Sequence, residues 1–163
     1  MLSIDVTGAD ETLARLTAAP AAIQAALRAK AADLAERLRR HVVDDKLSGQ
    51  VLQARSGALR DSIAAEVSAE GDGFTATVFS TGDVKYAAIQ EYGGKTPAHL
   101  IVPSKAKALA FTIGGGTVFA SRVNHPGSQI PARSYLRSAL ADMAGDITGE
   151  LKAAAVSALG GGD

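Results

Sequence analysis

Residues 21–42, AAIQAALRAKAADLAERLRRHV, decide the fold that the sequence predicts. Large apolar side chains recur in this stretch at helical spacing and share one face, which carries Ile23, Leu27, Leu34, Leu38 and Val42. This period predicts an amphipathic helix, and the many alanines favour helix further. We expect the helix to span residues 20–47. A break or kink is expected at residues 18–20, because Pro20 cannot donate a helical hydrogen bond.

Other elements are predicted on both sides of this helix. Residues 1–19 predict an N-terminal strand and a short helix, and residues 48–62 a loop. A β-rich part follows over residues 62–123, with a hairpin around residues 70–73, a short helix over 84–92, and two strands joined by Gly114, Gly115 and Gly116. Pro126, Gly127 and Pro131 predict an extended loop.

A second long helix is predicted over residues 133–159. Its apolar residues recur at spacings of three and four, at Leu136, Leu140, Met143, Ile147 and Leu151. The order of elements favours the α+β class. We therefore expect a single domain over residues 1–163, an antiparallel sheet of about four to five strands with two long helices packed on it, one near each terminus.

The amino-acid composition excludes several classes of protein. Alanine accounts for 33 of the 163 residues and aromatic residues for only 4%, so subunit contacts are expected to complete the burial. The absence of cysteine excludes disulfides and thiolate metal sites. Lys plus Arg equals Asp plus Glu at 17 each, so no overall basic excess recruits nucleic acid. We expect no membrane span, because no apolar run approaches roughly 20 residues. We expect no signal peptide, because the sequence from Met1 to Asp5 has neither a basic region nor a hydrophobic stretch of signal-peptide length.

Motifs for catalysis or cofactor binding fail on inspection. Gly94-Lys95-Thr96 resembles the end of a phosphate-binding loop, but Ile89 stands where that loop needs a glycine, and Pro97 where its helix should begin. His41 and Asp45 have helical spacing for two metal ligands without a third nearby. No serine lies in a Gly-x-Ser-x-Gly elbow. We expect no catalytic, cofactor or metal residue, and no enzyme.

The charges are unevenly placed along the chain. Residues 83–137 hold seven basic and two acidic residues, whereas the final 26 residues hold four acids and one lysine. The candidate contact residues are therefore the basic Lys95, Lys105, Lys107 and Arg122 and the acidic Asp142 and Asp146. Opposite charges can meet between neighbouring copies, or the basic residues can face a polyanion in a lumen. An ordinary solvated surface remains the third interpretation.

Five segments in order resemble a known family. They are Ser56-Gly57-x-Leu59-x-x-Ser62-Ile63, Tyr86-Ala87-x-x-x-Glu91-Tyr92-Gly93, Lys107-Ala108-Leu109-Ala110-Phe111, Val123-x-His125-Pro126-Gly127 and Ile130-Pro131-Ala132-Arg133-x-Tyr135-Leu136. Together, over about residues 20 to 150, they resemble the tail-component family of long-tailed bacteriophages, the neck or tail-completion proteins. The segment from Pro131 to Leu136 is also similar to phage virion morphogenesis proteins. Gln53-Ala54-Arg55 departs from the family, which often has a proline there.

The resemblance implies a structural virion protein with no catalytic residues. It implies a homo-oligomeric ring, expected to be a hexamer, at the head–tail junction around the DNA channel. Its expected partners are its own copies, head-connector and tail-terminator or tail-tube proteins, and packaged DNA in non-specific proximity, with no membrane. Such a protein is made in the host bacterial cytoplasm and ends in the neck of the virion. The alternatives are a stand-alone cytosolic binding or adaptor protein, and a hydrolase whose site assembles only in the fold.

Overall fold

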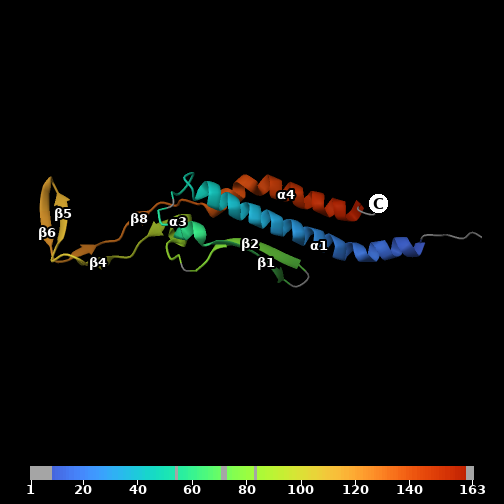
Figure 1. Ribbon diagram of the computed structural model, residues 1–163, viewed down its shortest axis with the longest axis horizontal. Helices are drawn as coiled ribbons and strands as arrows, with labels where there is room; N and C mark the ends of the chain where they lie inside the picture. Colours follow the sequence, from blue (N-terminus) through green and yellow to red (C-terminus); the bar gives the residue numbers. More distant parts are fainter. Residues whose placement is uncertain (1–8, 54, 71–72, 83, 161–163) are drawn as a thin grey trace, which may run out of the picture. The chain divides into compact units, whose positions relative to one another are not determined.

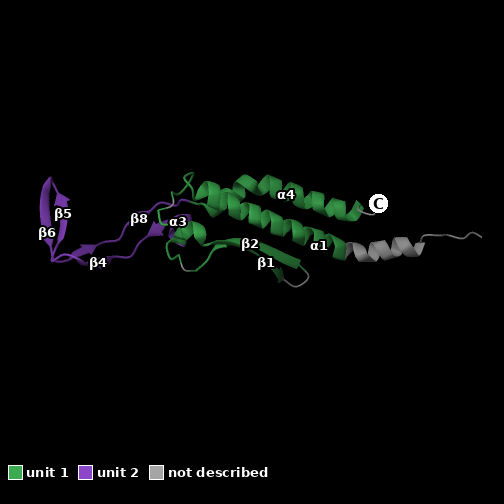
Figure 2. Cartoon of the chain, viewed as in Figure 1, with its two compact units in different colours: residues 1–87, 134–163 green, residues 88–133 purple. Residues whose placement is uncertain are grey.

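The computed structural model describes residues 9–53, 55–70, 73–82 and 84–160 (Figure 1). The chain divides into two compact units, coloured separately in Figure 2. Unit 1 comprises residues 1–87 and 134–163, and unit 2 comprises residues 88–133. The strand expected between residues 2 and 6 lies outside the described residues.

The first helix, α1, runs from Ala9 to His41 and continues directly into a π-helical turn, η1, over Val42–Lys46. The expected break at residues 18–20 is wrong, because the helix continues through Pro20. Alanine-rich sequence on both sides favours helix strongly enough to offset the one missing backbone donor. The expected apolar face is confirmed at Leu34 and Val42, which are buried.

The stretch expected to be a loop over residues 48–62 contains a further helix, α2, at Ala58–Asp61. The hairpin that follows is confirmed, with β1 at Ile63–Glu70 and β2 at Gly73–Ser80. The two strands pair antiparallel along their whole length, from Ile63 with Ser80 to Glu70 with Gly73. In Figure 1 this hairpin lies along α1.

The expected single sheet of four to five strands is wrong, because the described strands form four separate two-stranded sheets. Unit 2 begins within α3, the helix Ala87–Tyr92, and then holds three nested antiparallel pairs. These are β3 (Gly94–Lys95) with β8 (Gln129–Ile130), β4 (His99–Ile101) with β7 (Val123–His125), and β5 (Leu109–Ile113) with β6 (Gly116–Ala120). We call residues 94–130 the β arm. Each strand of the β arm pairs with one partner only, so the arm holds three two-stranded pieces and no wider sheet.

A tight turn closes the β arm. Ile113 pairs with Gly116, which leaves Gly114 and Gly115 as a two-residue loop, with φ values of 58° and 84°. Both values are positive, as a type I′ hairpin turn requires, and glycine adopts them without a steric penalty. We call β5 and β6 with this turn the tip hairpin.

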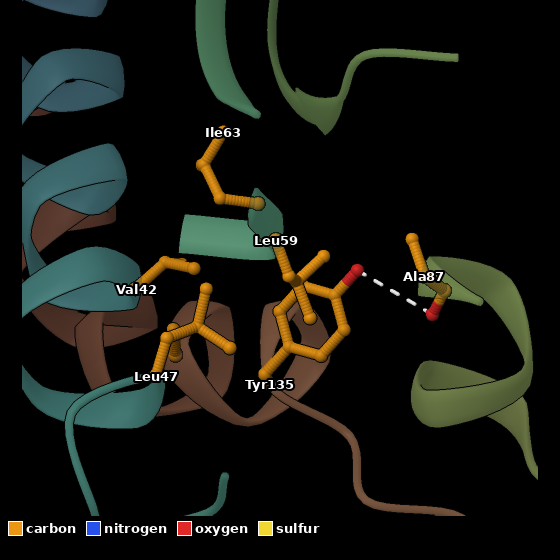
Figure 3. Packing of buried hydrophobic residues seen from close by; sticks show 7 residues of the cluster. Val42, Leu47, Leu59, Ile63, Ala87 and Tyr135 are labelled. Atoms are coloured by element: carbon orange, nitrogen blue, oxygen red, sulfur yellow. Dashed lines mark hydrogen bonds between the residues drawn. The ribbon is translucent and has the colours of Figure 1, made fainter. Parts of the chain in front are cut away.

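The last helix, α4, runs from Leu136 to Gly160 and packs on α1 rather than on the sheet. Its beginning completes the core of unit 1, where Tyr135 and Ala139 are buried with Val42, Leu47, Leu59, Ile63 and Ala87 (Figure 3). The Tyr135 hydroxyl donates to the carbonyl oxygen of Ala87 at 3.5 Å, so the largest side chain of the core has a polar partner. The expected long helix near each terminus is thus present.

Candidate functional site

The four basic candidate residues all lie in unit 2 and are exposed. Lys95 is in β3, Lys105 and Lys107 lie between β4 and β5, and Arg122 lies between β6 and β7. None of the four forms an ion pair with another described residue. Exposed cations without partners remain hydrated and available to an external anion.

The tip hairpin has one apolar face. Cross-strand partners point to the same side of a two-stranded ribbon, and successive residues alternate between sides. The register therefore places Leu109, Phe111, Ile113, Val118 and Ala120 on one face. The opposite face carries Ala110, Thr112, Thr117 and Phe119. Ile113 is 63% exposed and Val118 41%, whereas Leu109, Phe111 and Ala120 are half-buried, and Phe119 on the opposite face is 70% exposed.

Unit 1 contains an apolar groove with a volume of about 440 Å³. α1, β2 and α4 contribute its walls, which include Leu34, Leu38, Phe74, Val78, Leu140 and Ile147. Arg137 is the one charged residue that lines it. Leu140, which belongs to the apolar stripe predicted for α4, is 49% exposed on the wall of this groove, because α4 and β2 both pack beside α1 and leave a space between them.

Ion pairs join α1 to α4 along the helix interface. Glu150 Oε1 accepts a hydrogen bond from Arg37 Nη1, and its Oε2 accepts one from Lys30 Nζ at 3.3 Å. The hydrogen bond from Arg37 is the main cause that lowers the pKa of Glu150, and Glu150 in turn raises the pKa of Arg37. These partly exposed ion pairs favour one register of the two helices, although each contributes little energy.

A second polar contact surrounds Asp142, one of the two acidic candidates. Its Oδ2 lies 2.6 Å from Lys46 Nζ and 3.1 Å from His41 Nε2. The hydrogen bond from Lys46, followed by that from His41, lowers the pKa of the Asp142 carboxyl. His41 Nδ1 lies 2.6 Å from Asp45 Oδ2. Asp142 is therefore engaged within its own chain, whereas Asp146 is exposed and forms no hydrogen bond or ion pair with another described residue.

The three histidines contact carboxylates, backbone groups and each other among the described residues. Both ring nitrogens of His41 face carboxylates, so neither activates a serine. His99 and His125 stack across the β4–β7 pair with ring centroids 4.9 Å apart. Their Nδ1 atoms contact backbone groups, the Pro97 carbonyl and the Gly127 amide. No group of three or more potential metal ligands occurs in the part of the chain that the structure describes.

Sequence reasoning found the charged candidates and missed the two apolar surfaces. Alternation over residues 109–113 was the available signal for the tip face, whereas Val118, Phe119 and Ala120 are consecutive apolar residues. The helix residues of the groove wall belong to the predicted apolar stripes, but the sequence has no signal that α1, β2 and α4 leave an open groove between them. None of the described helices has both the length and the hydropathy that crossing a bilayer requires.

Two long helices, a hairpin and a β arm define an α+β protein. Residues 9–93 match the family described as "Bacteriophage HK97-gp10, putative tail-component". Because the match covers more than half of the 163 residues, the chain belongs to this family of bacteriophage tail components. Neither the curated proteins nor the solved structures contain a match to the chain.

The matched range ends at Gly93, before the β arm and α4. It contains the first two of the five segments that carried the resemblance, and the last three lie beyond it. The similarity of residues 131–136 to phage virion morphogenesis proteins stays a prediction.

Proposed function

We propose that this chain is a structural subunit of the neck of a long-tailed phage or related particle, at the junction of head and tail. The observation that carries the proposal is the membership of a bacteriophage tail-component family over residues 9–93. Exposed charges and an exposed apolar face are surfaces of the kind that an assembly subunit needs. In such a particle the chain is a virion component made in the host cytoplasm.

The proposed assembly is a ring of identical subunits, a hexamer, around the DNA channel. Its neighbours are the head connector on one side and the tail-terminator or tail-tube protein on the other. In a ring, Lys95, Lys105, Lys107 and Arg122 are repeated around an axis and form a basic belt. That belt either meets acidic surface of an adjacent subunit or attracts passing DNA without fixing one phosphate geometry.

Deletion of the gene from the phage or prophage tests the neck role. Full heads and separate, complete tails are expected in electron micrographs of the lysate, with joined particles restored by the wild-type gene in trans. A lysate with joined, infectious particles after deletion contradicts the neck role. Tails that are absent, with normal heads, place the function in tail building instead.

The two interpretations of the basic belt are separated by charge reversal at Lys105 and Lys107. A subunit contact predicts failed assembly that reversal of an acidic residue rescues. Asp146 is the better of the two candidates for that rescue, since Asp142 already binds Lys46 and His41. A lumen role predicts joined particles with altered retention or ejection of the genome.

A further inference from the structure

The β arm carries positive charges only. Its charged residues are Lys95, Lys105, Lys107 and Arg122, and no aspartate or glutamate occurs in it. Every residue of the arm belongs to the described part of the chain. Four basic and no acidic residues give the arm a formal charge of +4, whereas the whole chain is neutral. All four side chains are exposed, so their charged groups can meet an external anion.

Three of these cations lie where the strand pairing of the arm is interrupted. The β4–β7 pair and the β5–β6 pair are separated by residues 102–108 on one side of the ribbon and by residues 121–122 on the other. Lys105 and Lys107 belong to the first segment and Arg122 to the second. The three residues therefore come from both sides of the ribbon at one level along it. We call them the cation cluster.

The surroundings of the cation cluster favour phosphate as its ligand. Each of the two unpaired segments also holds an exposed serine, Ser104 in one and Ser121 in the other. Serine hydroxyls donate hydrogen bonds to phosphate oxygens, as lysine and arginine do. No carboxylate of the arm repels an approaching anion. The cluster thus combines positive charge with neutral donors at the same place.

Duplex DNA fits this arm better than a second copy of the chain does. DNA presents a regular array of phosphates, about one charge for every 1.7 Å of its axis. Its major groove, about 12 Å wide, admits a two-stranded β-ribbon. The described residues of unit 1 hold twelve basic and twelve acidic residues, so this part of a neighbouring copy offers no excess of negative charge.

We propose that the β arm binds duplex DNA through its phosphates, with the cation cluster as the main contact. This inference rests on the proposed function, which brings DNA within reach of the arm, and it names DNA as the partner of the basic belt. Each ammonium or guanidinium group that meets a phosphate releases a counterion. Phosphate contacts carry no sequence information, so the arm binds any sequence.

Fluorescence anisotropy of a labelled duplex, titrated with the purified full chain at several salt concentrations, tests the proposal. Wild type is expected to bind at low salt. The logarithm of its association constant should fall with the logarithm of salt concentration, with a slope of up to about −3.6 if all four cations contact phosphates. In a double variant, Lys105→Gln with Lys107→Gln, the slope should be shallower by about two, and binding at low salt should be roughly tenfold weaker or more.

A second double variant, Arg28→Gln with Lys152→Gln, is the matched control. It removes two exposed cations from unit 1, so the net charge of the chain changes equally in both double variants. The control should keep the affinity and the salt slope of wild type. Far-ultraviolet circular dichroism checks that both double variants retain the fold. A second duplex of unrelated sequence should bind wild type with an affinity that agrees within roughly twofold.

Three results would overturn the proposal. One is a wild-type chain that does not bind duplex DNA at low salt. If charge reversal at Lys105 and Lys107 then still stops particle assembly, the partner of the arm is an acidic protein surface. The second is an equal loss of affinity in the two double variants, which would assign binding to overall charge. The third is a strong preference for one of the two duplexes, because phosphate contacts cannot produce it.

These measurements use the purified chain and need no phage. DNA binding can therefore fail while gene deletion still yields separate heads and tails, in which case the neck role stands and the DNA contact is wrong. The opposite pair of results leaves the DNA contact standing and removes the neck role.

Discussion

Lys46 Nζ and Asp142 Oδ2 lie 2.6 Å apart and join the π-helical end of the first long helix to the last helix. Lys46 is only 8% exposed, and its other hydrogen bond is to Gln50 Oε1 at 3.2 Å. A buried ammonium group without an anionic partner is costly. The contact therefore makes the packing of α4 on α1 specific at this end.

Removal of this carboxylate should destabilise unit 1. Asp142→Asn keeps the shape of the side chain but takes the anionic partner from Lys46 and His41, so the midpoint of thermal unfolding should fall. Asp146→Asn is the matched control, one turn further along α4, where the carboxylate has no ion pair with a described residue. Equal midpoints for the two variants would show that the contact with Lys46 contributes nothing.

Stability should also fall in acid through the helix interface. The pKa values of Asp142 and Glu150 are lowered in the folded state, so both stabilise the fold above their ordinary values of 3.8 and 4.5. That contribution is lost as the pH falls through the lowered pKa values. The difference in unfolding midpoint between wild type and an Asp142→Asn, Glu150→Gln double variant should be largest near neutral pH and vanish in strong acid. A pH-independent difference would contradict this assignment.

Leucines at two predicted core positions should respond differently to truncation. Leu34 is 3% exposed, and Leu34→Ala should cost about 2–5 kcal/mol because it leaves a cavity. Leu140→Ala should cost clearly less, since about half of that side chain is already in water. Denaturant titration of both variants measures the free energies of unfolding. Similar losses in the free energy of unfolding for the two variants would mean that the groove is closed in solution.

Gly127 should be irreplaceable at the base of the β arm. Its φ is 85°, and a Cβ there would lie 2.0 Å from the carbonyl oxygen of Thr96. Gly127→Ala should therefore disturb the neighbouring strand pairs, at a cost above about 1–2 kcal/mol from the backbone conformation alone. Gly82→Ala, where a Cβ meets no atom within 4 Å, is the control. Amide hydrogen exchange in β3, β4, β7 and β8 should rise for the first variant only.

Local periodicity explains which parts of the fold could be predicted. The helix stripe of Leu34 and Val42 and the alternation over Ile63–Glu70 reflect burial on one face, and the sequence records that directly. The pairing of Gly94–Lys95 with Gln129–Ile130 has no such record. Each of these two strands has only two residues, and the close approach of Gly127 to Thr96 brings the strands together. Prolines nearby suggested an extended loop instead.

Among the candidate contact residues, too, some could be predicted from the sequence and others could not. Counting charges located the basic residues of unit 2, because their exposure needs no partner within the chain. The engagement of Asp142 by Lys46 depends on the register of two helices nearly a hundred residues apart along the chain. A signal was present: Asp142, Asp146 and Glu150 recur every four residues on α4 and thus share one face, as do Arg37 and His41 on α1.

A cryo-electron microscopy map of the purified particle tests the neck assignment most directly. We expect a ring of six copies between head and tail, each recognisable by two long antiparallel helices and a β arm. A map that accounts for every neck ring with other proteins, or that places this fold at the distal end of the tail, would contradict it.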